Sequence, residues 1–518
     1  MRDEPAAADV AADIAVIGAG PAGLAAAVTA AAAGRDVALV DAAPRPGGQF
    51  YRHRAVSSEE EDRRGGRGWE TFVRLREGLA AVRYLRGHRV WHIEPGFVVH
   101  ALAGDGAERG EGGNGDEAAE GGERGGRAVE IRARALILAP GAHDRVLPFP
   151  GWDLPGVLTA GAAQALAKGN GVAPGARTVV AGTGPFLLPV AAALATAGST
   201  VAGIFEANRP FGFGAALARH PARLAEAAGY AAALARARIP YLMGRAVVAA
   251  HGDDAVTAVT VARLDAGWRP VAGTERLVEC DTVAVGHGFA PQLELPLQLG
   301  CATRVTAEGD LVVEVDAAQR TSVPGVYAAG EITGIGGAQL ALVEGELAAL
   351  SVLAAGGASA GEMSSAAMSA AAMSAAARAV SGKAVSGKGV AWLLARRRRL
   401  RAFAAALGAA YAVRPGWPAW LRDDTVVCRC EEVPYERLVA AVALGATDPR
   451  TVKLLSRAGM GWCQGRVCGH ATAALTARAT GRALAASDLR GLVQRPIAQP
   501  IRLGDLAHAP ETREKEPP

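Results

Sequence analysis

Two uncharged stretches of the chain, residues 14–34 and 178–205, each contain the tetrapeptide Gly-x-Gly-Pro, and this repeated feature constrains the fold most strongly. Each stretch is long enough to cross a membrane as a helix. However, each begins with a short apolar run, turns at the two glycines and continues as an alanine-rich segment. A strand, a tight glycine turn and a helix form the first half of a Rossmann unit. We therefore predict an α/β protein with two Rossmann-type dinucleotide-binding domains and no transmembrane segment.

The first glycine turn fills every position of the dinucleotide-binding fingerprint, with Gly18, Gly20 and Gly23 in the sequence Gly-Ala-Gly-Pro-Ala-Gly. The first glycine permits the tight turn, the second lets the backbone approach a pyrophosphate, and the third allows the helix to pack closely on the strand. Asp41, at the end of the next predicted strand, is placed to accept a ribose hydroxyl. This turn therefore predicts a dinucleotide site at a helix N-terminus.

The second glycine turn has Gly182 and Gly184 but carries Leu187 in the third position, where a side chain would push the helix off the strand. Glu206 follows at the end of the next strand, where a ribose acceptor is expected. Two interpretations stay open here. The site binds NAD(P) or another adenine nucleotide, or the fold is retained with an altered site.

Four of the six cysteines form two close pairs near the C-terminus, Cys428-x-Cys430 and Cys463-x4-Cys468. Four thiolates in two pairs suit a structural zinc ion or a [2Fe–2S] cluster. Zinc ribbons usually place two residues within each pair, so these spacings are unusual for zinc. A cluster, a zinc ion and no metal at all are the three alternatives.

Composition excludes several functional classes. The chain has 518 residues, 20% of them charged, a net charge of +4 and only 5% aromatic residues. This is neither a disordered composition nor the footprint of a nucleic-acid-binding surface. The N-terminus lacks the basic start and apolar core of a signal peptide, so we expect a cytoplasmic protein with reduced thiols. Cys280 and Cys301 are expected to be small buried apolar residues.

Three further segments, residues 44–49, 136–142 and 321–331, resemble those of two-dinucleotide-domain flavoproteins with the glutathione-reductase-like fold. The resemblance implies FAD at the first site and Glu331 at the position where that family usually has an aspartate that holds the ribityl chain. A helix beginning after residues 336–337 would stabilise anionic reduced flavin. Together with the first fingerprint, these segments add the predicted FAD contacts Gly48, Gln49, Gly141, Gly330 and Glu331.

No cysteine precedes Cys280, so the redox dithiol of the disulfide reductases of this fold is missing and disulfide reduction is not expected. Residues 427–433 (Val-Cys-Arg-Cys-Glu-Glu-Val) and 459–466 (Gly-Met-Gly-Trp-Cys-Gln-Gly-Arg) resemble the bacterioferritin-associated-ferredoxin-like (BFD-like) [2Fe–2S] domain. With Pro-Gly-Gly-Gln at 46–49, the whole pattern resembles the large subunits of heteromeric amine dehydrogenases, a family that includes opine oxidases, hydrogen cyanide synthases and dye-linked L-proline dehydrogenases.

This resemblance implies FAD and a [2Fe–2S] cluster in the present chain, with the two cysteine pairs as ligands. It also implies a smaller FAD-containing partner subunit of the D-amino-acid-oxidase type. That partner would oxidise the C–N bond of an amino acid, opine or other secondary amine, and the present chain would relay the electrons. Two alternatives are a self-contained NAD(P)H-dependent flavoprotein reductase and a non-catalytic assembly subunit stabilised by a nucleotide. The catalytic residues are unknown, because no general base emerges from the sequence.

The predicted order of domains follows from these motifs and from two low-complexity stretches. A strand over residues 278–285 is expected to return the chain to the first domain, and residues 89–101 are expected to form one strand. The arginine run at residues 396–401 is expected to be a solvated helix face rather than a nucleic-acid or lipid contact. The predicted segments are the first portion of the FAD-binding domain at 10–150 with a disordered insertion at 104–126, the second nucleotide-binding domain at 151–277, the remaining portion of the FAD-binding domain at 278–353, a low-complexity linker at 354–389, a basic linker helix at 390–420, the small helical [2Fe–2S] domain at 421–490 and a tail at 491–518.

Overall fold

The structure is a computed structural model that describes residues 8–53, 68–104, 126–210, 213–355, 373 and 389–507. Most of the insertion predicted at 104–126, most of the linker predicted at 354–389 and the end of the predicted tail lie outside the described residues.

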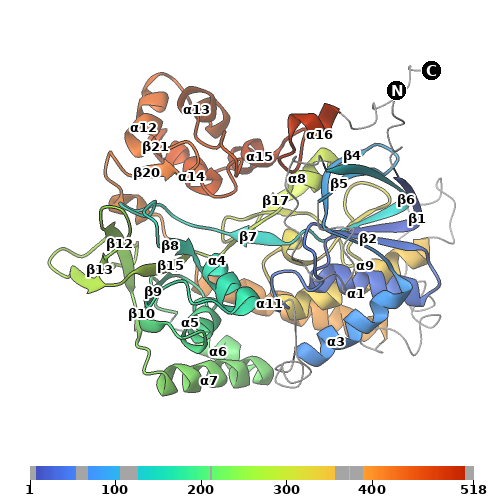
Figure 1. Ribbon diagram of the computed structural model, residues 1–518, viewed down its shortest axis with the longest axis horizontal. Helices are drawn as coiled ribbons and strands as arrows, with labels where there is room; N and C mark the ends of the chain where they lie inside the picture. The colour runs from blue at the N-terminus through green and yellow to red at the C-terminus, as the bar shows by residue number, and fades with distance from the viewer. Residues whose placement is uncertain are drawn as a thin grey trace, which may run out of the picture.

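A seven-stranded sheet carries the first glycine turn, and its strands run in the order β3-β2-β1-β6-β5-β4, with β19 pairing alongside β6 (Figure 1). β1 pairs in parallel with β2 and β6, and β4 and β5 form an antiparallel hairpin at one edge. α1 packs against α9, and α11 packs against α9 in turn. The elements of this half are β1 (Ala8–Ile17), α1 (Pro21–Ala32), β2 (Val37–Asp41), α3 (Trp69–Gly78), β3 (Arg83–Arg86), β4 (His88–Glu94), β5 (Val98–Ala103), β6 (Arg127–Leu138), β19 (Val326–Ala328), α9 (Ala338–Ala355) and α11 (Val390–Ala410), with 3₁₀ turns at Leu79–Ala81 and Gly330–Thr333.

A five-stranded parallel sheet carries the second glycine turn, in the order β11-β10-β9-β15-β8. A three-stranded antiparallel sheet, β12-β13-β14, follows it in the same half of the molecule. The elements are β8 (Val157–Thr159), α4 (Ala160–Ala165), a π-helix at Leu166–Asn170, β9 (Arg177–Gly182), α5 (Leu187–Thr196), β10 (Thr200–Glu206), α6 (Phe213–Ala218), α7 (Pro221–Arg236), β11 (Tyr241–Met243), β12 (Arg245–His251), β13 (Ala258–Arg263), β14 (Arg276–Glu279) and β15 (Thr282–Gly286).

Both uncharged stretches are thus divided into strand, turn and helix, as the glycine motifs predicted. The strand predicted over residues 278–285 is wrong, because it is two strands, and β15 pairs with β8 and β9 in the second sheet instead of returning to the first. The single strand predicted over residues 89–101 is also wrong. Pro95 and Gly96 reverse the chain there, and Gly96 and Phe97 both have positive φ, so the segment forms the β4–β5 hairpin.

Two short antiparallel strands, β7 (Ala142–Asp144) and β16 (Phe289–Pro291), connect the two sheet-bearing halves. The remaining elements of the first half are α8 (Glu294–Gln298) and the hairpin of β17 (Thr303–Val305) and β18 (Leu311–Val313). The elements of the C-terminal region are a 3₁₀ turn at Trp417–Trp420, β20 (Val426–Cys428), β21 (Val433–Pro434), α12 (Tyr435–Ala443), α13 (Pro449–Ser456), α14 (Gly469–Ala479), α15 (Ala486–Val493) and α16 (Leu503–Ala507). This region is mainly helical, and its α12 to α14 pack on the second half while α15 packs on the first half (Figure 1).

The arginine run of α11 is only partly solvated, which corrects the prediction of a solvated helix face. Arg397 is 9% exposed, and Arg401 forms an ion pair with the fully buried Glu344 of α9 at 2.6 Å. Arg396 donates to the side chain of Gln339, while Arg398 is exposed. The helix period therefore places some of the arginines against α9 and the others in solvent.

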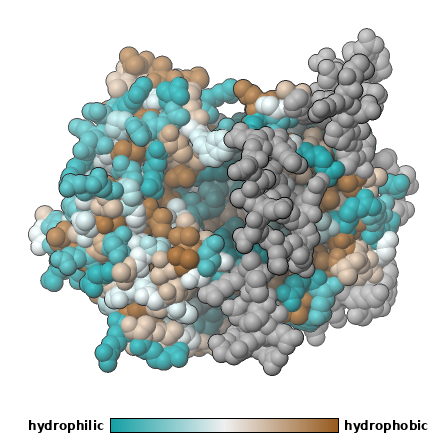
Figure 2. Space-filling view, viewed as in Figure 1, coloured by the Kyte–Doolittle hydropathy of each residue, from teal (hydrophilic) through white to brown (hydrophobic). Residues whose placement is uncertain are grey.

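Among the described residues, α9 is the one helix long and apolar enough to cross a membrane, and 83% of it is buried inside the protein. Elsewhere, apolar side chains are exposed on α12, on α13 and on the turns beside them, and brown atoms gather at that upper end of the molecule in Figure 2. They are Val439, Leu444, Leu454, Leu455 and Trp462.

Candidate functional site

The first glycine turn and the acid predicted to serve it lie together at the carboxyl ends of β1 and β2. α1 begins at Pro21, directly after Gly20. The carboxylate of Asp41 accepts hydrogen bonds from the amides of Ala19 and Ala43, the latter at 2.6 Å. Burial raises the pKa of Asp41, and the two amides oppose that shift. Asp41 remains partly exposed, so its carboxylate is within reach of a ligand.

The shape of this turn fits a pyrophosphate. A Cβ at Gly23 would lie 1.7 Å from the carbonyl oxygen of Gly18, so α1 and the turn touch there. A Cβ at Gly20 would meet nothing within 4 Å, so this region of the turn faces open space beside the N-terminus of α1. A Cβ at Gly48 would lie 2.9 Å from Cα of Gly20, which places the segment after β2 directly against the turn. These residues fit the FAD that the sequence predicts at this position.

The other predicted FAD contacts come from distant segments. Gly141 links β6 to β7, and Gln49 is exposed. A Cβ at Gly330 would lie 3.0 Å from Cβ of Ala22, so the segment after β19 packs against the start of α1. β6 thus carries Gly141 to the same end of the sheet as the glycine turn.

Glu331, which the sequence predicted to hold the ribityl chain of the flavin, lies in the 3₁₀ turn that precedes α9. Its carboxylate accepts hydrogen bonds from the amides of Gly336 and Gly337, both at 2.9 Å. Burial raises the pKa of Glu331 to about 7, although the two amides lower it. The two amides that precede α9 therefore bind a carboxylate of the chain itself.

The second glycine turn differs from the first in its contacts. Both oxygens of the Glu206 carboxylate are engaged, because Oε1 accepts from Oγ1 of Thr183 at 2.6 Å and from the amide of Asn208 at 2.8 Å, and Oε2 accepts from the amide of Gly184 at 2.9 Å. The side chain of Glu206 is fully buried, and burial raises its pKa to about 7. Leu187 is buried as the first residue of α5, and Gly182 ends β9. Both oxygens of Asp41 also accept amide hydrogen bonds, but Asp41 remains partly exposed, whereas Glu206 is fully buried and out of reach of a ribose hydroxyl.

The four C-terminal cysteines are brought together by β20 and by the loop before α14. Hydrogen bonds link their side chains in the order Cys428, Cys468, Cys463 and Cys430. No three His, Cys, Asp or Glu side chains within the described region of the chain are grouped so that they would hold a single metal ion. A tetrahedral zinc needs its sulfurs around one centre, whereas a [2Fe–2S] cluster takes two cysteines at each of two irons. Four neighbouring thiols supply the ligands that either group needs, and the unusual spacings within the two pairs favour the cluster.

Main-chain amides also point at these sulfurs. The amide of Gly459 donates to Sγ of Cys428 at 3.4 Å, and the main chain of Gly465 bonds the thiol of Cys463. A hydrogen bond from Cys468 lowers the pKa of Cys463, and the bonds of Cys468 with Cys428 and with Cys463 raise the pKa of Cys468. Such amides stabilise thiolates and tune the potential of a cluster.

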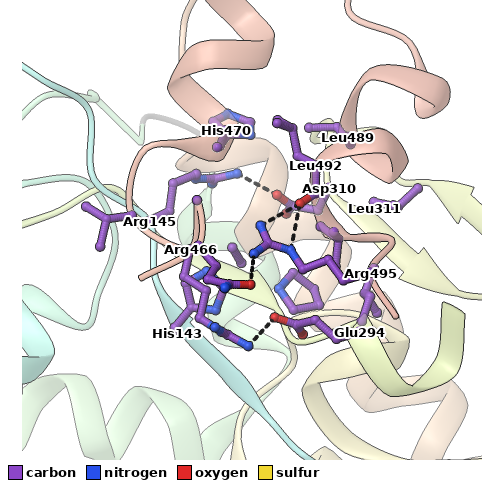
Figure 3. Close-up of a pocket in the computed structure, with 18 of the residues that line it drawn as sticks. His143, Arg145, Glu294, Asp310, Leu311, Arg466, His470, Leu489, Leu492 and Arg495 are labelled. Atoms are coloured by element: carbon purple, nitrogen blue, oxygen red, sulfur yellow. Dashed lines mark hydrogen bonds and ion pairs between the residues drawn. The ribbon is translucent and has the colours of Figure 1, made fainter. Parts of the chain in front are cut away.

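A small cavity of about 80 Å³ lies between the loop that bears Cys463 and Cys468 and the strands that connect the two halves (Figure 3). Two ion pairs and one hydrogen bond line it, each between one arginine and one acceptor. Arg145 pairs with Asp310 at 2.5 Å, Arg466 pairs with Glu294 at 2.7 Å, and Arg495 donates to Gln464 at 2.5 Å.

Two histidines complete the wall of this cavity. Burial lowers the pKa of His143 to about 4, with a further contribution from the charge of Arg466, and a hydrogen bond to the main chain of Arg466 opposes the shift. Burial and the charge of Arg145 lower the pKa of His470 to about 3. Both imidazoles are therefore neutral at physiological pH, so the arginines carry the positive charge of this wall.

The sequence did not identify His143, Glu294 or Asp310. His143 lies two residues after the predicted FAD contact Gly141, and that proximity was the available signal. Glu294 and Asp310 have no local motif. Cys280 and Cys301, which the sequence predicted to be small buried residues, are both buried. Burial raises the pKa of Cys280 to about 11 and also raises the pKa of Cys301.

Comparison with known proteins agrees with this geometry. A family model described as pyridine nucleotide-disulphide oxidoreductase matches residues 12–346, and one described as BFD-like [2Fe-2S] binding domain matches residues 426–478. The chain is 34% identical to hydrogen cyanide synthase subunit HcnB of Pseudomonas aeruginosa, over 90% of this chain and 93% of that protein. It is 33% identical to an opine oxidase subunit of Agrobacterium tumefaciens, over 96% of this chain and 92% of that protein.

The fold resembles the crystal structure of L-proline dehydrogenase from P. horikoshii, with a TM-score of 0.62 and 20% identity, over 98% of this chain and 81% of that one. The two family models imply FAD in the first two thirds of the chain and a [2Fe–2S] cluster in the C-terminal region.

Proposed function

The chain belongs to the pyridine nucleotide-disulphide oxidoreductase family, joined to a BFD-like [2Fe–2S] domain, and from this premise we propose that it is the electron-relaying subunit of a heteromeric amine or amino-acid dehydrogenase. A smaller FAD-containing subunit of the D-amino-acid-oxidase type oxidises the C–N bond of an amino acid, opine or other secondary amine. The present chain accepts the electrons and passes them on through its two cofactors.

One contact carries this proposal. β7 begins directly after Gly141, a predicted FAD contact, and its residue His143 bonds the main chain of Arg466, which lies between the predicted ligands Cys463 and Cys468. The segment predicted to contact the flavin and the loop predicted to hold the cluster are therefore in direct contact. FAD and the cluster would supply the redox chemistry, and the protein determines their separation and potentials.

The chain's own residues hold this arrangement together. Gly18, Gly20, Gly23 and Asp41 would bind the dinucleotide, and Cys428, Cys430, Cys463 and Cys468 would bind the iron. The pair of Arg466 with Glu294 fixes the cluster loop to α8, at the edge of the first half. The pair of Arg145 with Asp310 likewise joins the segment after β7 to the β17–β18 hairpin of the first half.

Two similar proteins and the apolar surface of α12 and α13 support the proposal that this chain works with a partner subunit. Two similar proteins are named as subunits, of an opine oxidase and of a hydrogen cyanide synthase, and opines are secondary amines. The apolar side chains exposed on α12 and α13 are of the kind that a contact between subunits covers. We further infer a cytoplasmic location with reduced thiols, supported by the six free cysteines.

Purification of the chain alone, and together with a candidate partner flavoprotein of the D-amino-acid-oxidase type from the same organism, tests this proposal. Amine-dependent reduction of an artificial dye is expected from the pair and not from the isolated chain, although the isolated chain carries FAD and iron. Full amine turnover by the isolated chain would overturn the relay function.

A further inference from the structure

In the second dinucleotide-binding domain, the acid and the glycine-turn amide that a nucleotide would contact are bonded to each other. In the first domain, the acid Asp41 binds the amide of Ala19, the middle residue of the glycine turn. In the second domain, the corresponding acid Glu206 binds the amide of Gly184, one residue further along. Gly184 corresponds to Gly20, whose amide lies beside the expected pyrophosphate. The second turn thus uses, for its own acid, the amide that the first turn keeps for the ligand.

The backbone of the two turns differs accordingly. Gly20 has φ −74° and caps α1, which begins at the next residue. Gly184 has φ +111°, and α5 begins only at Leu187. Pro185 and Phe186 therefore stand where the first turn of the helix would point its amides at a phosphate.

A segment of the same chain covers the acid. After α11, the carbonyl oxygen of Ala412 accepts a hydrogen bond from Nδ2 of Asn208 at 3.0 Å, and the carbonyl oxygen of Tyr411 lies 3.5 Å from Oγ1 of Thr183. The hydroxyl of Tyr411 bonds that of Tyr241, the first residue of the adjacent strand β11. The 411–412 segment therefore lies over the end of β10, where an adenosine would meet the acid.

The second dinucleotide-binding domain also packs directly against the cluster domain. The indole of Trp420 donates to the carbonyl oxygen of Trp268 at 2.9 Å, and the indole of Trp152 donates to that of Val426 at 2.5 Å. One continuous hydrophobic core joins β9, β12 and β13 to the helices of the cluster domain. The 411–412 segment is the start of this connection.

We infer that the second dinucleotide-binding domain binds the chain's own Tyr411–Ala412 segment in place of a pyridine or adenine nucleotide. Its role is to position the cluster domain, which packs against it. NADH and NADPH consequently have no site from which to reduce the flavin. Electrons enter this chain from another donor. This inference concerns the second domain alone and does not depend on the identity of that donor.

The test uses the full-length protein loaded with FAD and iron, with NADH, NADPH and ATP as probes. Equilibrium dialysis is expected to find no saturable binding with a Kd below about 1 mM. Anaerobic NADH is expected to leave the flavin absorbance unchanged. Hydrogen exchange of residues 408–416 is expected to be slow and the same with and without each nucleotide. Saturable binding of any of the three by the wild-type chain, or faster exchange of this segment on adding one of them, would overturn the inference.

A variant of Asn208 tests the contact itself. Asn208→Ala removes the donor to Ala412 and to Oγ1 of Thr183, and is expected to speed exchange of residues 408–416 by at least about tenfold, the effect of one lost buried hydrogen bond. Since Asn208 also accepts from the indole of Trp268 at 3.2 Å, Asn208→Asp keeps that acceptor while removing the donor, and should give the same result. Asn170→Ala, at an exposed asparagine of the same domain, is the matched control. Wild-type exchange in both Asn208 variants would contradict the proposed occupant.

Discussion

The guanidinium of Arg466, in the loop between Cys463 and Cys468, lies 2.7 Å from the carboxylate of Glu294 in α8. The arginine is 18% exposed and the glutamate 7%, so the pair is largely withdrawn from water. Arg466 also donates to the carbonyl oxygen of Ala498 at 2.6 Å. This pair joins the cluster domain to the half that carries the first glycine turn.

Removal of this pair should loosen the cluster domain. Glu294→Gln leaves the guanidinium of Arg466 without its counter-charge, and breaking a buried pair typically costs about 3–5 kcal/mol. We expect about 3 kcal/mol, seen as earlier loss of the cluster's visible circular dichroism on heating. Glu226→Gln breaks the more exposed pair of Arg223 and Glu226 and should cost less than about 1 kcal/mol. Equal effects of the two variants would show that the Arg466 pair does not fasten the loop.

The ligand assignment predicts a sharp division among the six cysteines. Replacing any of Cys428, Cys430, Cys463 or Cys468 by Ser should abolish the iron–sulfur spectrum and leave the flavin bound, because each thiolate completes the coordination of one iron. Cys280→Ser is the control, since its thiol lies outside the group. Iron and sulfide analysis of the wild-type protein should give about two of each per chain. One zinc per chain, or a retained cluster in a ligand variant, would refute the assignment.

Substitutions of Gly23 and Gly20 in the first turn should have different effects. Gly23→Ala places a Cβ 1.7 Å from the carbonyl oxygen of Gly18 and should prevent folding of the first half. Gly20→Ala meets nothing within 4 Å, so the protein should fold but bind FAD at least about tenfold more weakly, because the pyrophosphate approaches the backbone there. Gly229→Ala, in the exposed α7, is the control and should change neither property. Flavin content after purification measures all three, and normal FAD binding by Gly20→Ala would contradict the assigned site.

Burial of Glu206 predicts a dependence of stability on pH. Its folded-state pKa is raised to about 7 from 4.5, so the folded protein holds the proton more tightly than the unfolded chain. This contribution to stability is complete below pH 4.5 and is lost as the pH rises through 7. It amounts to at most ~3 kcal/mol.

Thermal unfolding between pH 5 and pH 8 measures this effect. The wild-type Tm should fall more over this range than that of Glu206→Gln, whose side chain does not titrate. Glu279→Gln, at an exposed glutamate on β14, should follow the wild-type curve. A Glu206→Gln curve parallel to the wild type would show that Glu206 stays ionised throughout.

The regions of the molecule that the sequence predicted correctly are those with short-range patterns. The two glycine turns and the two cysteine pairs each lie within a few residues, and their spacing alone indicates a turn or a sulfur site. Asp41 and Glu206 were predicted to lie beside their turns because one helix and one strand of predictable length separate each acid from its turn.

The remaining features depend on contacts between distant segments. Thr183 and Tyr411 are separated by 228 residues, and nothing near either residue indicates that one segment covers the other. The sequence around Glu344 gives no sign that it is buried and paired, because its partner Arg401 comes from a different helix. The sequence of an apolar strand such as β15 does not indicate which sheet it joins, so its assignment to the first sheet was wrong. Its pairing with β8 and β9 places it in the second sheet.

Electron paramagnetic resonance of the cluster after addition of a secondary amine tests the relay most directly. The chain is mixed anaerobically with an opine, proline or sarcosine, either alone or in complex with the small flavoprotein partner. The relay function predicts that the signal of the reduced cluster appears in the complex and is absent from the isolated chain. A cluster that stays oxidised in the turning-over complex, or one that the amine reduces in the isolated chain, would contradict it.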